Sequence, residues 1–454
     1  MAKDVTQSIA VNPTAVFHRS LTKTYPKAVH GDGVYLQDEY GRRVLDGSSG
    51  AAVSSVGHNN RKVIEAIVRQ AEAMSFAHTS FFTNDPSEEL AALIIAKNHG
   101  AFSKVMFLTS GSEAVESALK LSRQYHVCNG DPKRNKVIGR QYAYHGNTLG
   151  ALAAGFNPQR RETFAPFLCD TAFHHVSPCS YSRDAKDGES ASEYTKRLLA
   201  EWDRKFQELD PCTVAAVIIE PVGGATLGSP PAAEGYLAGL RQLCDKYGAL
   251  LIYDEAMYGM GRVGTYHAWE ALGGIPPDLQ AIGKGLAEGY QPLSAVLLNE
   301  KVYTTLAEDS VAHPFVSGHT YQAHAIGCAA GLAVQRILTD ENHDLLAHVR
   351  KMGVVLTRLL RTCLPSEVLK DIRGLGLFQS IEFASVDRSG RPLAKEVSEL
   401  SFMNGAAVYL CSSAVDAIML APPFIISEEQ VRELVDVVVK SVRQVLERRV
   451  AEEV

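Results

Sequence analysis

Short apolar segments alternate with helical segments through the middle of the chain, and this alternation constrains the fold more than any other feature. The apolar segments cover residues 105–108, 214–219, 250–253 and 295–298, and helical patterns cover 113–125 and 234–247. Strands that alternate with helices form a largely parallel sheet with helices on its faces. We therefore expect an α/β fold with a mostly parallel central sheet.

The two ends of the chain differ in texture from the middle. The early stretch GDGVYLQDEYGRRVLDG alternates apolar and polar residues around a turn at 38–41, which predicts a β-hairpin. After residue 327 we expect long amphipathic helices, a strand at 376–383, and a terminal helix capped by Ser427 and Gln430.

At 454 residues the chain is too long for one small core, so more than one lobe is expected. No low-complexity linker separates the lobes, which predicts that they pack together. We assign residues 1–56 and 327–454 to a small α+β lobe and residues 57–326 to a large domain.

Composition and charge exclude several classes of function. The chain has 45 Lys and Arg against 51 Asp and Glu, a formal charge of −6 without a basic run, so nucleic acid is not an expected partner. Its eight scattered cysteines form no C-x-x-C pair, which indicates free thiols in a reducing compartment and no metal site. No apolar run approaches the roughly 18 residues of a membrane span. We expect a cytoplasmic protein away from membranes, although the N-terminus is not acidic enough to argue against organelle import.

The first motif that carries chemistry is VMFLTSGSEAVESALK, which predicts a buried strand, a turn at Ser110-Gly111-Ser112 and a helix. Free backbone amides at a helix start, with the helix dipole behind them, form a phosphate site. The pattern Ser110-x-x-Glu113 is also that of a capping box, which needs no ligand. Both interpretations stay open on this motif alone.

The second motif is GALLIYDEAMYGMGRVG, an apolar strand that ends in Asp254-Glu255. Ligands of α/β sheets bind at this edge, and a carboxylate there can keep the pyridine nitrogen of pyridoxal phosphate (PLP) protonated. The alternative is a surface Asp-Glu pair at a strand end.

The third motif is AIGKGLAEGYQPLSAVLL, in which Lys284 lies between two glycines. This lysine is either a solvated loop charge or an amine whose pKa is lowered by desolvation. The order of phosphate turn, aspartate and lysine is far more specific than any single motif.

Nine stretches in this order resemble the class III aminotransferases, also called omega-aminotransferases, of PLP fold type I, across nearly the whole length. They are LDGSSGAAVSSVGH, SGSEAVESALK, YHGNT, IIEPV, DEAMYGMGRVG, IGKGLAEGYQP, GHTY, RGLGLFQSIEF and LAPPFII. The resemblance implies a PLP enzyme that moves an amino group from a primary amine or omega-amino acid to a keto acid or aldehyde by a ping-pong mechanism. It also implies a homodimer with shared active sites.

By this resemblance Lys284 is the Schiff-base lysine and the catalytic acid and base. Asp254 would pair with the pyridine nitrogen, and Tyr144 would lie on one face of the ring. The turn residues Ser110, Gly111 and Ser112 would bind the phosphate. Further cofactor contacts are implied for Thr320 of the neighbouring subunit, for Glu220 near the lysine and for His145, whose alternative is a structural hydrogen bond.

The chain departs from the family pattern at three places. Ala256 replaces a valine that packs on the second ring face. Ala52 replaces a tryptophan of many amine:pyruvate members, which would leave a more open substrate pocket. Ser412 stands where many members carry an arginine for a substrate carboxylate, which argues against a glutamate- or GABA-specific enzyme. Arg262 is a substitute candidate for that contact, with loop structure as its alternative, and Phe82 is a further candidate for the substrate pocket.

Three rival functions remain. An aminomutase or decarboxylase of the same fold would share Lys284, Asp254 and the phosphate turn. A nicotinamide dehydrogenase would share the sheet pattern, but no G-x-G-x-x-G opens a helix after the early strands. A non-catalytic relic is disfavoured because Lys284 and Asp254 are intact.

Overall fold

The computed structural model describes residues 14–384 and 390–453, and a seven-stranded sheet lies at its centre. Its order is β4 (Lys104–Leu108), β10 (Ser294–Leu298), β9 (Leu279–Ile282), β8 (Leu250–Asp254), β7 (Val214–Ile219), β5 (Lys136–Arg140) and β6 (Phe173–Val176). Five strands, from β9 to β6, run parallel, whereas β10 is antiparallel to both of its neighbours. The expected α/β fold with a mostly parallel sheet is confirmed, with β10 as the strand of opposite direction.

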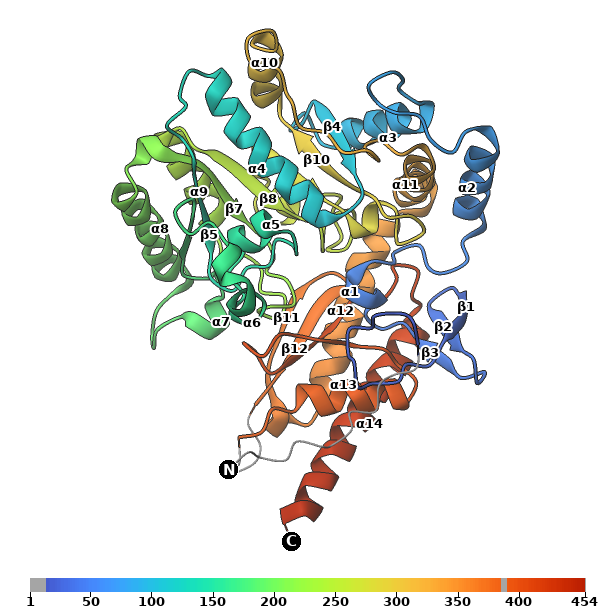
Figure 1. Cartoon of the computed structure of the whole chain (residues 1–454). Coiled ribbons are helices and arrows are strands. Elements are labelled where there is room, and N and C mark those ends of the chain that lie inside the picture. The colour runs from blue at the N-terminus through green and yellow to red at the C-terminus, as the bar shows by residue number, and fades with distance from the viewer. Residues whose placement is uncertain (1–13, 385–389, 454) are drawn as a thin grey trace, which may run out of the picture.

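The central strands are mostly apolar because helices cover both faces of the sheet (Figure 1). On one face, alternate residues of β7 and β8 pack with α4 (Gly111–Cys128). On the other face the intervening residues pack with α8 (Ala191–Glu208) and α9 (Tyr236–Tyr247). The first set includes Ala216, Ile218, Leu250 and Ile252, and the second includes Val217, Ile219, Leu251 and Tyr253. Because successive side chains of a strand point to opposite faces, both faces of β7 and β8 are used for packing. The positions that remain for chemistry are those at the strand ends.

Segments from both ends of the chain lie together below the central sheet in Figure 1. The N-terminal part has β1 (Ala28–Asp32), β2 (Tyr35–Asp38) and β3 (Arg43–Leu45), so the predicted hairpin exists with one additional strand. The C-terminal sheet has the order β11 (Leu369–Leu375), β12 (Phe378–Phe383), β14 (Ala417–Leu420) and β13 (Tyr409–Leu410).

Backbone hydrogen bonds join these two parts, since the Leu45 amide donates to Gly405 and the Ala407 amide donates to Leu45. This supports one small lobe from both chain ends, while its boundaries at 56 and 326 remain a prediction. The strand predicted at 376–383 begins at 378 because Gly376, with φ of 53°, forms the turn before it.

The remaining helices surround the sheets. They are α1 (Ser49–Ala52), α2 (Arg61–Ala73), α3 (Asp85–Ala96), α5 (Leu149–Ala154), α6 (Pro158–Arg161), α7 (Tyr181–Asp184), α10 (Glu300–Glu308), α11 (Ala325–Leu338), α12 (Leu345–Cys363), α13 (Ala394–Met403) and α14 (Glu428–Glu453). Ser427 and Gln430 exchange two hydrogen bonds at the start of α14, which confirms the predicted cap. All eight cysteines fall in the described ranges and are free thiols. No helix within those ranges is long and apolar enough to cross a bilayer.

Candidate active site

The predicted cofactor residues lie at one edge of the central sheet, where the parallel strands end. Glu220 follows β7, Asp254 ends β8, and Lys284 follows β9 by two residues. Because β10 is antiparallel to both β4 and β9, strand β4 runs in the same direction as β9. The turn at Ser110 after β4 therefore reaches the same edge, which is where α/β sheets bind ligands.

Asp254 is paired with His145 in the interior of this edge. The His145 Nδ1 lies 2.9 Å from the Asp254 Oδ2, and both side chains are buried. A carboxylate only accepts, so Nδ1 carries the proton, and the buried Nε2 has no hydrogen-bond partner in the described residues. The Ala256 amide donates to the other carboxylate oxygen at 3.1 Å. These contacts hold the carboxylate in one orientation, so His145 has a specific partner beyond ordinary core packing.

Glu220 supports the backbone around Tyr144. Its carboxylate accepts the Tyr144 amide at 3.3 Å and the Gly224 amide at 3.1 Å. Burial raises the pKa of Glu220, the nearby Asp254 charge raises it further, and His145 opposes this shift. Glu220 thus lies in the same electrostatic environment as the Asp254–His145 pair.

Lys284 has the environment expected of a tuned amine. Burial lowers the pKa of Lys284, while Asp254 and Glu220 oppose that shift. Its amine makes no hydrogen bond or ion pair with any residue of the described ranges. Its φ is 41°, a left-handed conformation that costs a non-glycine residue about 1–3 kcal/mol and is concentrated at functional sites.

The 3-10 turn η4 (Lys284–Leu286) that carries this lysine is held from behind by α11. The side-chain amide of Gln335 donates to the carbonyls of Gly285 at 3.1 Å and Leu286 at 3.0 Å. The lysine is therefore presented on a fixed turn and is not a solvated loop charge.

The Ser110 turn is a capping box that leaves backbone amides available at the start of α4. The Ser110 hydroxyl accepts the Glu113 amide at 3.2 Å, and the Glu113 carboxylate accepts the Ser110 amide at 3.2 Å. Among the described residues, the amides of Gly111 and Ser112 bond to no other group. The two readings of this motif are therefore compatible, because the cap uses two amides and leaves two for a phosphate.

Close packing joins the three motifs. A Cβ on Gly111 would lie 3.3 Å from the Cβ of Ala256, and one on Gly283 would lie 3.8 Å from the same atom. The Ser294 hydroxyl donates to the Ser110 carbonyl at 2.7 Å. The turn after β4, the residue after the Asp-Glu pair and the residue before Lys284 thus form one wall.

Four supporting residues escaped the sequence reasoning. The Asn147 amide donates to the Ser112 hydroxyl at 2.9 Å, and the Tyr258 hydroxyl donates to the Asp254 carbonyl at 2.5 Å. Ser294 and Gln335 are the other two. Asn147, Tyr258 and Ser294 lie inside the motifs YHGNT, DEAMYGMGRVG and AIGKGLAEGYQPLSAVLL, so their place in a motif could have marked them as site residues. Gln335 lies outside every motif, and nothing in the sequence marks it.

The predicted substrate residues Ala52 and Ser412 flank the loop after Glu220. The Ser412 hydroxyl donates to the Thr226 carbonyl at 2.9 Å, and its amide donates to Ala225 at 3.0 Å. Ala52 is 1% exposed and belongs to an apolar cluster that includes Leu227, the residue after Thr226, and Cys411, the residue before Ser412. The structure thus brings both residues to one apolar region beside the cofactor edge.

Arg262 is fully engaged with the backbone. Its guanidinium donates to the carbonyls of Ser54 at 2.5 Å, Ala421 at 3.1 Å and Pro422 at 2.5 Å, and its carbon lies 4.5 Å from the centre of the Phe424 ring. Burial lowers the pKa of Arg262 to about 9. This geometry favours the loop-structure alternative for Arg262.

Phe82 and Thr320 lie on two exposed neighbouring loops, and the loop of Thr320 also contacts the strand before the Ser110 turn, because the Ala323 amide donates to the Phe107 carbonyl at 3.3 Å. Phe82 is 66% exposed. The Asn84 side chain donates to the Ala323 carbonyl at 2.9 Å, which holds the two loops together. The Thr320 hydroxyl makes no hydrogen bond within the described ranges.

The donor set fits PLP. It offers an amine with a lowered pKa, a buried carboxylate for a pyridine nitrogen, a histidine nitrogen that lacks a partner, and two free amides for a phosphate. Fold and site together are those of a PLP-dependent enzyme. A family model for class III aminotransferases matches residues 17–442, and the chain belongs to this family.

Known relatives agree with this assignment. An aminotransferase of Gibberella zeae is 39% identical, over 88% of this chain and 81% of its own length. The omega transaminase of Pseudomonas jessenii, solved with pyridoxamine phosphate, superposes with a TM-score of 0.87 at 28% identity and covers 92% of both chains. A thermostable omega transaminase variant engineered for the synthesis of bulky amines gives a TM-score of 0.87 at 28% identity, over 93% of this chain and 94% of its own. These structures identify the fold as PLP fold type I.

Proposed function

We propose that this transaminase moves an amino group from a primary amine or omega-amino acid to a keto acid or aldehyde, in two half-reactions of a ping-pong cycle. The observation that carries the proposal is that Lys284, Asp254 and the Ser110 turn lie at one edge of the central sheet, where Asp254 is buried and paired with His145 at 2.9 Å. PLP, when bound, supplies an electron-withdrawing ring that stabilises negative charge on the substrate carbon.

Each residue of the edge has a role in this proposal. Asp254 pairs with the pyridine nitrogen and keeps it protonated, while His145 fixes the carboxylate. The free amides of Gly111 and Ser112 bind the phosphate. Tyr144, whose backbone is held by Glu220, covers one face of the ring.

Lys284 transfers protons. A buried amine is closer to neutral at physiological pH than a solvated one, so it can accept a proton from the substrate carbon. The negative charges of Asp254 and Glu220 stabilise the protonated form, which then donates the proton to the cofactor carbon. Burial favours the neutral amine and the two carboxylates favour the ammonium, so Lys284 can both accept and donate a proton.

For the substrate, we propose a pocket that accepts bulky amines without a carboxylate. Ala52 and Ser412 supply neither a tryptophan nor an arginine at the two positions discussed above. The related variant engineered for bulky amines has a tryptophan, a phenylalanine and an arginine replaced by smaller uncharged residues. Binding would then come from apolar burial, at about 25 cal/mol per Å².

We also propose a homodimer with shared active sites. The loops around Phe82 and Thr320 expose several large apolar side chains, including Phe81, Val311, Val316 and Tyr321, and such patches mark interaction sites. Thr320 would bind the phosphate of the partner. The free thiols are compatible with a reducing compartment, and we propose a cytoplasmic location.

The test begins with the absorbance spectrum of the purified protein and a screen of amine donors with pyruvate. We expect cofactor absorbance, keto-acid-dependent product, and higher kcat/KM for bulky amines than for glutamate or GABA. Product analysis separates transamination from its rival in the same fold, because a decarboxylase releases carbon dioxide and an aminomutase isomerises its substrate. Clear superiority of glutamate or GABA over every hydrophobic amine would refute the open pocket.

A further inference from the structure

Two consecutive arginines in α6 have different environments. Arg161 is buried and donates to the carbonyls of Ala153 at 3.2 Å and Gly155 at 3.0 Å, and to the Asp170 carboxylate at 3.0 Å. Arg160 is exposed, and its guanidinium makes no hydrogen bond or ion pair with any residue in the described part of the chain. Its carbon lies 4.9 Å from the centre of the Tyr144 ring.

Arg160 therefore lies beside Tyr144 at the candidate active site and has no ion-pair partner among the described residues. Burial raises the pKa of Tyr144, and Arg160 is the strongest charge that opposes this shift, while Asp254 and Tyr409 add to it. Tyr144 is thus influenced both by the Arg160 guanidinium, which lies against its ring, and by the carboxylate of Asp254. A guanidinium that stacks on a ring keeps its N–H edge available for a carboxylate.

Helix α6 also contacts the turn that lacks the expected arginine. The side-chain amide of Gln159, the residue before Arg160, donates to the Ser413 hydroxyl. Ser412, the residue before Ser413, is fixed to the loop after Glu220 because its hydroxyl donates to the Thr226 carbonyl. The free cation thus belongs to a segment that touches the Ser412 turn.

On these grounds we propose that Arg160 binds the carboxylate of the keto acid acceptor, an inference that rests on the proposed transaminase function. The guanidinium and the carboxylate form a charge-assisted pair beside Tyr144. Because Arg160 is exposed, a substrate without a carboxylate binds without leaving a buried charge unpaired. One site would thereby accept a keto acid in one half-reaction and an apolar amine in the other.

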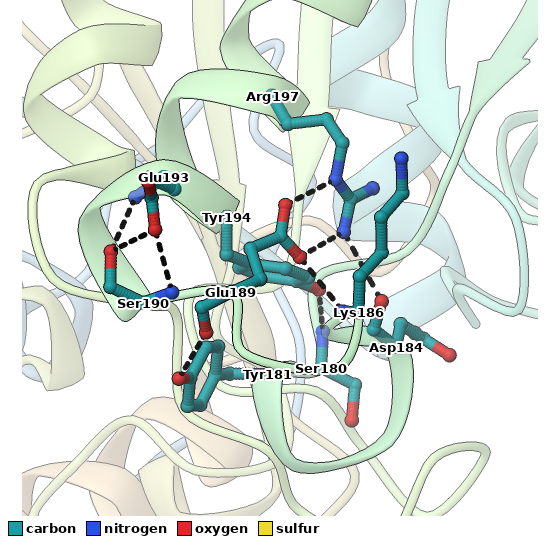
Figure 2. Close-up of polar contacts among 9 residues, drawn as sticks. All are labelled: Ser180, Tyr181, Asp184, Lys186, Glu189, Ser190, Glu193, Tyr194 and Arg197. Atoms are coloured by element: carbon teal, nitrogen blue, oxygen red, sulfur yellow. Dashed lines mark hydrogen bonds and ion pairs between the residues drawn. The ribbon is translucent and has the colours of Figure 1, made fainter.

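Other arginines near the site are less suited. Arg262 is occupied by three carbonyls. Arg183 lies 5.3 Å from the Tyr142 ring centre but has Asp184 within 3.5 Å as its counter-charge. Figure 2 shows how the loop around Asp184 is fixed to α8, where Arg197 donates to both oxygens of Glu189 and to the Asp184 carbonyl. Arg19 also acts on Tyr144, although less strongly than Arg160, and is the competing candidate.

The experiment compares holoenzyme variants Arg160→Leu, Arg160→Lys and Arg19→Leu with Arg204→Leu, a control at an exposed position of α8. Each half-reaction is followed separately, with pyruvate and a neutral aldehyde as acceptors and a carboxylate-free amine as donor. Binding of propionate, which has no amino or keto group, is measured by calorimetry as a readout independent of turnover.

Arg160→Leu should lower kcat/KM for pyruvate and weaken propionate binding by about 10- to 100-fold, in line with the loss of a charged hydrogen bond. In Arg160→Leu the aldehyde and amine reactions should stay within about twofold of wild type. Arg160→Lys should keep part of the wild-type affinity for pyruvate and propionate, and Arg204→Leu should change neither kinetics nor binding. Equal losses for pyruvate and aldehyde would overturn the proposal, because they would indicate disturbed packing of Tyr144. A selective loss in Arg19→Leu with none in Arg160→Leu would also overturn it. Failure of the proposed function is a separate outcome, since wild type would then transfer no amino group to any acceptor.

Discussion

Replacing the buried Gly146 with alanine should damage the phosphate end of the site. A Cβ at this position would lie 2.6 Å from the Ser112 hydroxyl oxygen, 2.9 Å from the Ser112 Cα and 2.8 Å from the Ala151 Cβ. Its φ of 145° also lies outside the range that side chains favour. Ser112 is on the first turn of α4, where even a small shift re-aims the two free amides.

Two costs add in this variant. Backbone strain accounts for about 1–3 kcal/mol, and overpacking against Ser112 and Ala151 adds about 1–3 kcal/mol more. Gly130 offers a matched control, because its φ is 74° and a Cβ there would meet nothing within 4 Å. Gly130→Ala should therefore cost only the strain, about 1–2 kcal/mol.

The assay measures urea unfolding of the apoprotein and the Kd of PLP for both variants. We expect Gly146→Ala to be the less stable of the two and to bind PLP at least about tenfold more weakly, whereas Gly130→Ala keeps the wild-type Kd. If the two variants agree in stability and in Kd, Gly146 does not make room for Ser112 and the phosphate assignment loses this support.

Three further predictions concern charged side chains. Lys284→Ala should abolish turnover and the covalent cofactor adduct that borohydride traps, and normal transamination in this variant would exclude the lysine as the acid and base. Asp254→Asn should bind PLP but slow proton transfer by about 10²- to 10³-fold. In the apoprotein, where the amine of Lys284 is free, Asp254→Asn should also lower the pKa of Lys284 further, because removal of a negative charge disfavours the ammonium form, and a pKa that rises or stays fixed would contradict this. Arg262→Lys should leave the kinetics with keto acids unchanged but reduce stability by about 1–3 kcal/mol, since it leaves buried carbonyls without donors, and thermal unfolding checks this.

The sheet and the cofactor edge could be predicted because their signals are local. Each strand that carries Asp254 or Glu220 is a short apolar run followed directly by its functional residue. Parallel strands end at one edge, so spacing along the chain was enough to bring these side chains together. The reversed strand β10 was not predicted, since an apolar run of five residues has no mark of direction.

The two readings of the Ser110 motif could not be separated from sequence, because the answer depends on which amides remain free. The capping box was visible as Ser110-x-x-Glu113, but its compatibility with a phosphate appears only when the partners of each amide are known. Arg262 is a similar case. Its three acceptors belong to residues 54, 421 and 422, which are distant in sequence, so its structural role has no local signal.

The pair Arg160-Arg161 extends this argument to specificity. The two residues have the same chemistry and adjacent positions. Arg161 donates to the Asp170 carboxylate and to two carbonyls, whereas the Arg160 guanidinium makes no hydrogen bond or ion pair with any described residue and lies 4.9 Å from the centre of the Tyr144 ring. What makes an arginine available to a substrate is therefore the absence of local acceptors, which is a property of the folded surroundings. An arginine missing from the Ser412 turn does not imply that the pocket lacks a cation, because a contacting segment can supply one. Substrate predictions for such chains should follow from the unpaired charges around the site and not from one family position.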